Sequence, residues 1–314
     1  MKKMLSETAF HRAESFIDLN ARPLEKSWFD YYFNGGSGSS VITELQKFQN
    51  EDGGFGNGLE ADFWMPASSP IATSVAFQQL IQLDPLPESV PLIEKGIRYF
   101  EKSYVESRNG WYSVLQQVNE YPHAPWWQAD PETGMTVIDQ HWGNPAAEII
   151  GYLFTYKEKL TVLDPVTLAE TAIGNLNQLQ MFDSQHEIYC YIRLYNMLPA
   201  PLASKMDPAL KTAVTSLVHP DPSQWDSYVA KPLDFVSCPE NKRFGIKEEW
   251  ISRNLDFLVD TLEKEGRVKP NWKWGIYEDA WRKAEKAWAG VLTLKALTLL
   301  ASFGRVKMNI ISGS

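Results

Sequence analysis

The stretch that decides the fold of this chain is LQKFQNEDGGFG at residues 45–56. An apolar periodicity typical of a helix runs into it over 39–49, and a second helical pattern begins after it at 70–83. A glycine-rich turn with one aromatic residue therefore connects two predicted helices. Similar turns at 110–112 and 272–275 also precede helical segments, which predicts a repeated helix–turn–helix unit.

Helical periodicity recurs along the whole chain, and strand signals are scarce. The sequence predicts helices at residues 7–18, 39–49, 70–83, 89–105, 145–160, 165–181, 184–197, 206–217, 246–264 and 279–303. Each predicted pair of successive helices has an apolar face that it cannot bury alone, so the pairs must stack. Closing the stack into a ring removes its two open ends. No linker-like run divides the chain, so we expect one domain over 1–311, with 312–314 as an added tail.

Composition narrows the classes of function. The chain has 314 residues, of which 44% are hydrophobic and 22% charged, as in an ordinary globular protein. Its formal net charge of −9 argues against non-specific nucleic-acid binding, which needs clustered Lys and Arg. The 12 Trp, 13 Tyr and 15 Phe favour an aromatic-lined cavity for a small-molecule substrate.

Targeting and redox signals are few. Cys190 and Cys238 do not make a disulfide framework. The N-terminus lacks the apolar run of a signal peptide, and the apolar stretch at 289–303 is too short to span a bilayer. We therefore expect a cytoplasmic protein, with peripheral membrane contact left open.

Two segments carry a resemblance to a known superfamily. The sequence QNEDGGFG at 49–56 resembles the turn repeat of squalene-hopene cyclases and protein prenyltransferase β-subunits, and WAGVLTLKAL at 288–297 is similar to the inner helix after such a turn. The resemblance implies an all-α fold, an (α/α) toroid of about five or six helix hairpins around an aromatic cavity, as a stand-alone domain. It also implies a hydrophobic isoprenoid substrate. The acid and metal motifs of those families are absent, so the resemblance points to a fold and a substrate class.

Candidate acids follow the first turn, in GLEADFW at residues 58–64. Glu60 and Asp62 alternate along an extended segment, which would point both carboxylates the same way. Two close carboxylates split their pKa values into an acid and a base. An acid beside Trp64 would protonate an alkene or a glycosidic oxygen. The alternative is that both carboxylates are solvated or cap the following helix.

A second group of candidates lies in DQHWGNPAAE at residues 139–148. Asn144 is the expected N-cap, before a proline at the first helical position. His141 with Asp139 would form an acid/base pair. Glu148 lies in the first predicted turn, where it is either a catalytic acid or a partner of the helix dipole.

Aromatic residues in the long turns are the candidate substrate-binding residues. They are Trp64, Trp126, Trp127, Trp142, Trp272, Trp274 and Tyr277. Two prolines stiffen the segment at 121–127, so its tryptophans would line a pocket, stack on a sugar or stabilise a cation; the alternative is a lid packed on the core. His186 and Cys190 are spaced like metal ligands, but the ligand set is incomplete, so we expect no metal and no cofactor.

Three hypotheses for the function stay open. The leading one is a terpenoid-cyclase-like or prenyltransferase-like enzyme that acts on an isoprenoid, with Glu60 or Asp62 as the acid. The second is a carbohydrate-active enzyme, a glycosidase or lyase, because (α/α) toroids also host that chemistry and paired carboxylates with Trp platforms suit it. The third is a non-catalytic domain that binds a lipid or a peptide. A closed apolar cavity would favour the first hypothesis, and an open polar groove beside paired carboxylates the second.

Overall fold

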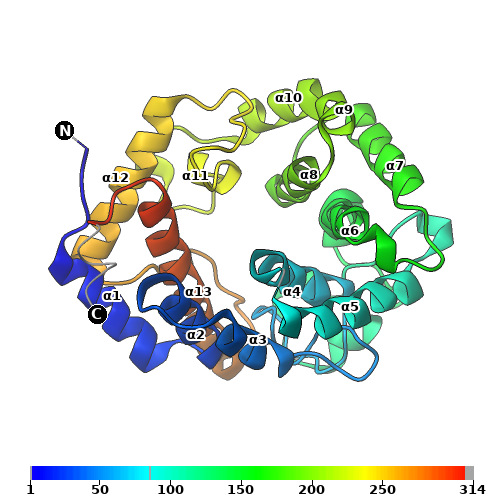
Figure 1. The fold of residues 1–314 in the computed structure, drawn as a ribbon, viewed down its shortest axis with the longest axis horizontal. Coiled ribbons are helices and arrows are strands. Elements are labelled where there is room, and N and C mark those ends of the chain that lie inside the picture. The colour runs from blue at the N-terminus through cyan, green and yellow to red at the C-terminus, as the bar shows by residue number, and fades with distance from the viewer. Residues whose placement is uncertain (1, 85, 308–314) are drawn as a thin grey trace. The chain divides into compact units, whose positions relative to one another are not determined.

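The computed structural model describes residues 2–84 and 86–307, and the described chain is all-helical (Figure 1). The α-helices are α1 (Glu7–Asn20), α2 (Pro23–Phe33), α3 (Gly38–Gln46), α4 (Pro70–Leu83), α5 (Val90–Ser103), α6 (Gly143–Thr155), α7 (Pro165–Gln178), α8 (Gln185–Met197), α9 (Ala200–Ala203), α10 (Asp207–Leu217), α11 (Pro232–Phe235), α12 (Glu248–Glu265) and α13 (Glu278–Ser302). Short 3₁₀ turns lie between them. Extended pairing among these residues is limited to three isolated bridges. The all-α prediction is confirmed.

The predicted helices begin and end within a few residues of the observed ones. The exceptions are the predictions at 145–160 and 165–181, which extend past the observed ends of α6 at Thr155 and α7 at Gln178. The sequence analysis did not identify α2, α9 or α11. A signal for α2 was present. Pro23 occupies its first turn, and the buried pairs Leu24/Trp28 and Phe29/Phe33 are each four residues apart, which is helical spacing.

Residue contacts divide the chain into two compact units. Unit 1 comprises Met1–Glu44 and Val218–Ser314, and unit 2 comprises Leu45–Leu217. The single domain predicted over 1–311 and the closure of the helix pairs into a toroid stay predictions. The predicted tail at 312–314 lies outside the described residues.

Unit 1 is built around α13, which packs on α1, α2 and α12. Arg305, just beyond α13, is 1% exposed and joins both ends of this unit. Its guanidinium donates to the carbonyl of Lys3 at 2.7 Å, to Asp256 Oδ1 at 2.6 Å and to Ser252 Oγ at 3.0 Å. Its own carbonyl accepts the N–H of Leu5 at 2.8 Å. One buried cation therefore connects the N-terminal segment, α12 and the end of α13.

Unit 2 is built around α6, which packs on α4, α7 and α8 (Figure 1). The ring of Phe77 on α4 lies 5.1 Å from Phe100 on α5 and 5.2 Å from Tyr152 on α6, measured between ring centroids. Trp111 is fully buried, and its indole N–H donates to the carbonyl of Phe100 at 2.8 Å. These contacts hold α4, α5 and α6 in one apolar core.

The glycine-rich turn fastens α4 to the turn after α3. Gly53 has a positive φ of 93°, as the prediction of a tight turn requires. Gly54 is needed for a different reason, because a Cβ there would lie 2.5 Å from the Ser68 side chain. Phe55 is fully buried, and its N–H donates to Thr73 Oγ1 on α4 at 2.9 Å.

Candidate functional site

The predicted site residues fall in three places. In unit 2, the loop at 58–66 pairs with 121–127, and α6 begins beside α8; in unit 1, the loop at 266–277 packs on α13. The first place holds Glu60, Asp62, Trp64, Trp126 and Trp127, the second holds His141, Trp142 and Glu148, and the third holds Trp272, Trp274 and Tyr277. The predicted single cavity around all of these residues stays a prediction.

Glu60 and Asp62 lie in a packed pair of loops. They are 9% and 5% exposed, so the alternative in which both are solvated is wrong. Glu60 Oε1 accepts the N–H of Asp62 at 3.1 Å, and the Asp62 carbonyl accepts the N–H of Ala124 at 2.8 Å. Trp127 is buried with its ring edge-to-face on Phe63, 5.4 Å between centroids. The role of the two carboxylates as acids stays a prediction.

The aromatic candidates differ in exposure. Trp127 and Trp274 are buried, Trp64, Trp126, Trp142 and Trp272 are half-buried, and Tyr277 is exposed. The indole N–H of Trp142 donates to the carbonyl of Arg108 at 3.1 Å, which fixes the chain before α6. Trp272 is therefore a better candidate for ligand contact than the buried Trp274.

One buried carboxylate organises the Glu148 cluster, which we define as Ser74, Gln78, Glu148 and Arg193. Glu148 lies on α6 and is 1% exposed. From α4, the Ser74 hydroxyl donates to Oε1, and Gln78 Nε2 lies 3.2 Å and 3.3 Å from the two carboxylate oxygens. From α8, Arg193 Nη1 donates to Oε2 at 2.6 Å. The carboxylate therefore joins three helices.

Arg193 is the residue of this cluster whose side chain reaches solvent. Its side chain is 39% exposed, whereas that of Glu148 is enclosed. Burial lowers the pKa of Arg193, but the attraction of Glu148 outweighs burial and raises this pKa above its usual value. Nε and Nη2 have no hydrogen-bond partner among residues 2–84 and 86–307. A guanidinium held on one edge and open on the other is suited to bind a carboxylate or phosphate.

The His141 cluster lies at the start of α6 and consists of His141, the Gly143 N–H, Asp183 and Glu187. Nδ1 of His141 is 3.6 Å from Asp183 Oδ1 and 3.8 Å from Glu187 Oε2. Glu187 is 5% exposed and accepts the Gly143 N–H at 2.8 Å. Burial raises the pKa of Glu187, opposed by that N–H and by His141. The His141 side chain is 26% exposed, so its ring reaches solvent.

The predicted pairing of His141 with Asp139 is wrong. Asp139 is 2% exposed, and its carboxylate accepts the Ser113 N–H at 2.7 Å and the N–H and hydroxyl of Thr136, both at 2.8 Å. The 3₁₀ turn at Ile138–Gln140 separates the two side chains, because residues two apart do not share a face of such a turn. Asp139 closes the turn, and His141 faces α8.

The predicted N-cap role of Asn144 is wrong for its side chain. Asn144 lies at a kink in α6 with a non-helical backbone, φ −106° and ψ 108°, as a residue before the first helical proline is expected to have, but its side chain makes no capping hydrogen bond to the following N–H groups. Its Oδ1 faces the thiol of Cys190 at 3.7 Å. Cys190 is 3% exposed, and burial together with Glu148 raises the pKa of the thiol. The interpretation of Cys190 as a small buried residue is confirmed.

Glu187→Gln tests the buried carboxyl. A folded-state pKa above the usual 4.5 means that Glu187 contributes stability at low pH and loses it as pH rises through that raised value. The substituted amide does not titrate and can still accept the Gly143 N–H. We therefore expect the free energy of unfolding of the variant to increase relative to wild type as pH rises above 4.5, in urea denaturation at several pH values. A difference that instead favours wild type with rising pH would mean that His141 stabilises an ionised carboxylate.

The sequence analysis missed four residues of these two clusters: Ser74, Gln78, Glu187 and Arg193. Glu187 and Arg193 flank the apolar residues of α8, and Glu148 lies in an otherwise apolar part of α6. A charge in an apolar helix face needs a partner, so these residues could have been matched. Ser74 and Gln78 carry no such signal, because short polar residues are common on half-buried helices.

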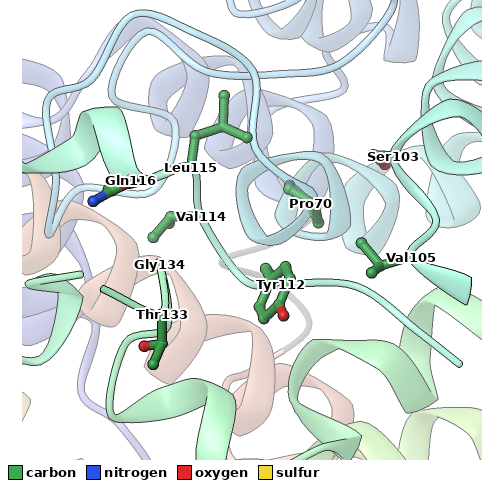
Figure 2. Close-up of a pocket in the computed structure, with 9 residues that line it drawn as sticks. All are labelled: Pro70, Ser103, Val105, Tyr112, Val114, Leu115, Gln116, Thr133 and Gly134. Atoms are coloured by element: carbon green, nitrogen blue, oxygen red, sulfur yellow. The ribbon is translucent and has the colours of Figure 1, made fainter. Parts of the chain in front are cut away.

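A pocket of about 250 Å³ lies at the start of α4. Figure 2 shows its lining, with Pro70 and Tyr112 facing Val114 and Thr133 across the view and Leu115 above them. Its lining is mainly apolar, and this volume is near the lower end of small-molecule sites. The guanidinium of Arg108 lies over the Tyr112 ring, 5.0 Å from its centre, and helps to hold that ring in place.

Comparison with protein-family models, curated proteins and solved structures found no match for this chain. The resemblance to the terpenoid-cyclase turn repeats stays a prediction. Across the described ranges, no three His, Cys, Asp or Glu side chains come together as a metal site requires. None of the described helices combines the length and apolar character needed to cross a bilayer.

Proposed function

We propose that this chain is a carbohydrate-active enzyme, a lyase that cleaves a sugar acid beside the Glu148 and His141 clusters. One observation carries the proposal. His141 turns Nδ1 toward two carboxylates, and its Nε2 has no partner in the part of the chain that the structure describes. An imidazole oriented on one nitrogen and open on the other is the arrangement of a general base.

The carboxylates beside His141 orient its ring. Glu187 and Asp183 face Nδ1, which favours a proton on that nitrogen and leaves the Nε2 lone pair available. They also stabilise the imidazolium that forms when Nε2 accepts a proton. Neither carboxylate has to reach the substrate, which agrees with the burial of Glu187.

Arg193 supplies the binding site for the substrate anion. Glu187 and Arg193 are six residues apart on α8, about 9 Å along the helix axis. His141 lies against Glu187 at one end of this span and Arg193 stands at the other, so one sugar residue could bridge His141 and Arg193. The open edge of Arg193 would hold the sugar carboxylate bidentately, with Glu148 fixing its orientation.

The chemical step is a β-elimination. Nε2 of His141 takes the proton from the carbon next to the sugar carboxylate. The electrons of that C–H bond form a carbon–carbon double bond and expel the glycosidic oxygen from the neighbouring carbon. The leaving oxygen takes the proton back from the imidazolium. Arg193 stabilises the charge that develops on the carboxylate, and the products are two sugar fragments, one of them unsaturated.

A second observation favours the isoprenoid hypothesis as an alternative. The pocket at the start of α4 is mainly apolar, and Pro70, Ser74 and Gln78 follow one side of that helix at four-residue spacing. An isoprenoid diphosphate could place its hydrocarbon in this pocket and its diphosphate toward Arg193. Glu148 is paired with Arg193, which suits it to orienting this cation better than to protonating an alkene.

The experiment is a turnover assay with glucuronate and galacturonate oligosaccharides, read by the ultraviolet absorbance of the unsaturated product. We expect turnover by wild type and a loss of about 100-fold or more in kcat for His141→Gln, since removal of a general base costs this much. Arg193→Lys keeps the positive charge but loses the two parallel N–H donors of the guanidinium, so it should raise KM as well as lower kcat.

The control is His11→Gln, an exposed histidine on α1 that contacts Glu14, and it should retain full activity. Activity that survives in His141→Gln would contradict the proposal. Geranyl diphosphate is assayed in parallel by mass spectrometry. Its consumption, with no elimination from either uronate, would replace the lyase proposal with the isoprenoid alternative.

A further inference from the structure

A row of aromatic and charged side chains lies along α13 in unit 1 and includes no residue of the proposed lyase site. The rings of Tyr228 and Trp272 are 5.8 Å apart between centroids, and those of Trp272 and Trp288 are 5.1 Å apart. Each pair is close to perpendicular, at 74° and 79°. Tyr228 is 55% exposed and both tryptophans are half-buried, so this aromatic group reaches the surface.

Hydrogen bonds fix the loop that carries Trp272. The Val268 N–H donates to Thr293 Oγ1 on α13 at 2.9 Å. Asn271 Nδ2 donates to the carbonyl of Ser227 at 2.6 Å, beside Tyr228. The aromatic group is therefore held from both sides before any ligand arrives, which lowers the entropic cost of binding.

The two indoles carry unused donors. Nε1 of Trp272 and Nε1 of Trp288 are covered from solvent and have no hydrogen-bond partner among the described residues. A covered N–H without an acceptor costs free energy, so the two groups require an explanation. The exposed part of each ring, and not its covered N–H, is therefore what a ligand at the surface would contact.

Two lysines meet at Asp234 of α11, Lys295 from α13 and Lys231 from the residue before α11. Lys295 is seven residues after Trp288, about 10 Å along the same helix face. Its ammonium donates to Asp234 Oδ1 at 3.1 Å, and its side chain is 49% exposed. Asp234 Oδ2 accepts the backbone N–H of Lys231 at 3.0 Å, which places Lys231 on the other side of this carboxylate.

The ammonium of Lys231 lacks a hydrogen bond within the described ranges although the side chain is half-buried. Burial lowers the pKa of Lys231; Asp234 and Asp226 oppose this change and Lys295 adds to it. Burial also raises the pKa of Asp234, but Lys295, the Lys231 N–H and the Lys231 charge outweigh it and lower that pKa overall. One half-buried carboxylate is thus shared between two cations, and Lys231 has unused donors.

From this geometry we infer that unit 1 binds an acidic sugar along α13, with the ring against Tyr228, Trp272 and Trp288 and the anionic group at Lys231 and Lys295. The aromatic rings take the apolar face of the sugar ring. The unused donors of Lys231 and the exposed ammonium of Lys295 hold the anion. The site uses no residue of unit 2, so it stands whether or not the proposed lyase activity is found.

The test is a titration of the full chain followed by the indole ¹H–¹⁵N signals, with Trp272 and Trp288 assigned from Trp→Phe variants. The probes are sodium glucuronate, glucose 6-phosphate and methyl glucoside. We expect both indole signals to shift with the acidic sugars at concentrations about tenfold lower than with methyl glucoside, the effect of one charge-assisted hydrogen bond. The stronger of the two acidic probes identifies a uronate or a sugar phosphate as the ligand class.

Variants separate this site from its surroundings. The double variant Lys231→Met/Lys295→Met should lose the tenfold preference for acidic sugars and keep the thermal unfolding midpoint within a few degrees. Lys286→Met removes an exposed lysine from the opposite side of α13 and should change nothing. Arg193→Lys should leave the indole shifts intact even if it abolishes elimination. The inference is overturned if the two indole signals do not move, or if methyl glucoside moves them as readily as glucuronate.

Discussion

Arg193→Met should lower the free energy of unfolding by about 2 to 4 kcal/mol. The loss arises from Glu148, which is 1% exposed and would stay buried without its cation. Ser74 and Gln78 would still donate to the carboxylate, but neutral donors do not replace a guanidinium. We place the loss below the full cost of breaking an enclosed pair because the Arg193 side chain is 39% exposed. Urea denaturation followed by circular dichroism measures it.

The double variant Arg193→Met/Glu148→Leu shows whether the stability loss of Arg193→Met comes from the unpaired charge of Glu148 or from lost packing. Removing both charges eliminates the buried carboxylate, so the double variant should be more stable than Arg193→Met alone. Arg98→Met is the matched control, because that arginine is 61% exposed and lies 3.7 Å from Glu94. It should change stability by less than about 0.5 kcal/mol. A double variant less stable than Arg193→Met would show that packing, and not charge, dominates this site.

Arg305→Met should lower the free energy of unfolding by about 2 to 4 kcal/mol through unit 1. The variant loses three hydrogen bonds from a guanidinium that is 1% exposed, and it leaves the Lys3 carbonyl and Asp256 without that donor. Asp256 is 32% exposed, so water recovers part of the loss. Thermal unfolding and amide hydrogen exchange measure the effect, with the largest increase in exchange expected near the N-terminal segment.

Arg282→Met is the matched control for Arg305→Met. Arg282 lies on α13, is 74% exposed and is 3.8 Å from Asp279, so its removal should cost less than about 0.5 kcal/mol. Equal unfolding midpoints for the two variants would contradict the role of Arg305 in joining both ends of unit 1.

Local signals in the sequence predicted most of the helices. The apolar periodicity of α4 and α8, the serine N-caps at Ser69 and Ser184, and the glycine turn before α4 all act within a few residues. The prediction missed α2 although its signals were of the same kind. The sequence therefore predicted the fold class and the positions of most helices, because both depend on backbone preferences and apolar patterns within a few residues.

The sequence predicted only part of the candidate site. Glu148 and His141 were identified, but their partners were not: no partner was predicted for Glu148, which is held by Arg193, and His141 faces Glu187 instead of Asp139. Glu148 and Arg193 are 45 residues apart, and they meet because α6 and α8 pack together. A spacing rule within one helix cannot predict such a pair.

The sequence by itself determined that this chain is all-α and that acids, aromatic rings and one histidine lie in or near its turns. Tertiary structure decided which of these residues meet. The packing of α4, α6 and α8 enclosed Glu148 and left one edge of Arg193 open, and the loop at 266–277 placed Trp272 against Trp288. The physical reason is that helix formation follows local patterning, whereas charge pairing, burial and pKa shifts depend on neighbours that only folding brings within a few ångströms.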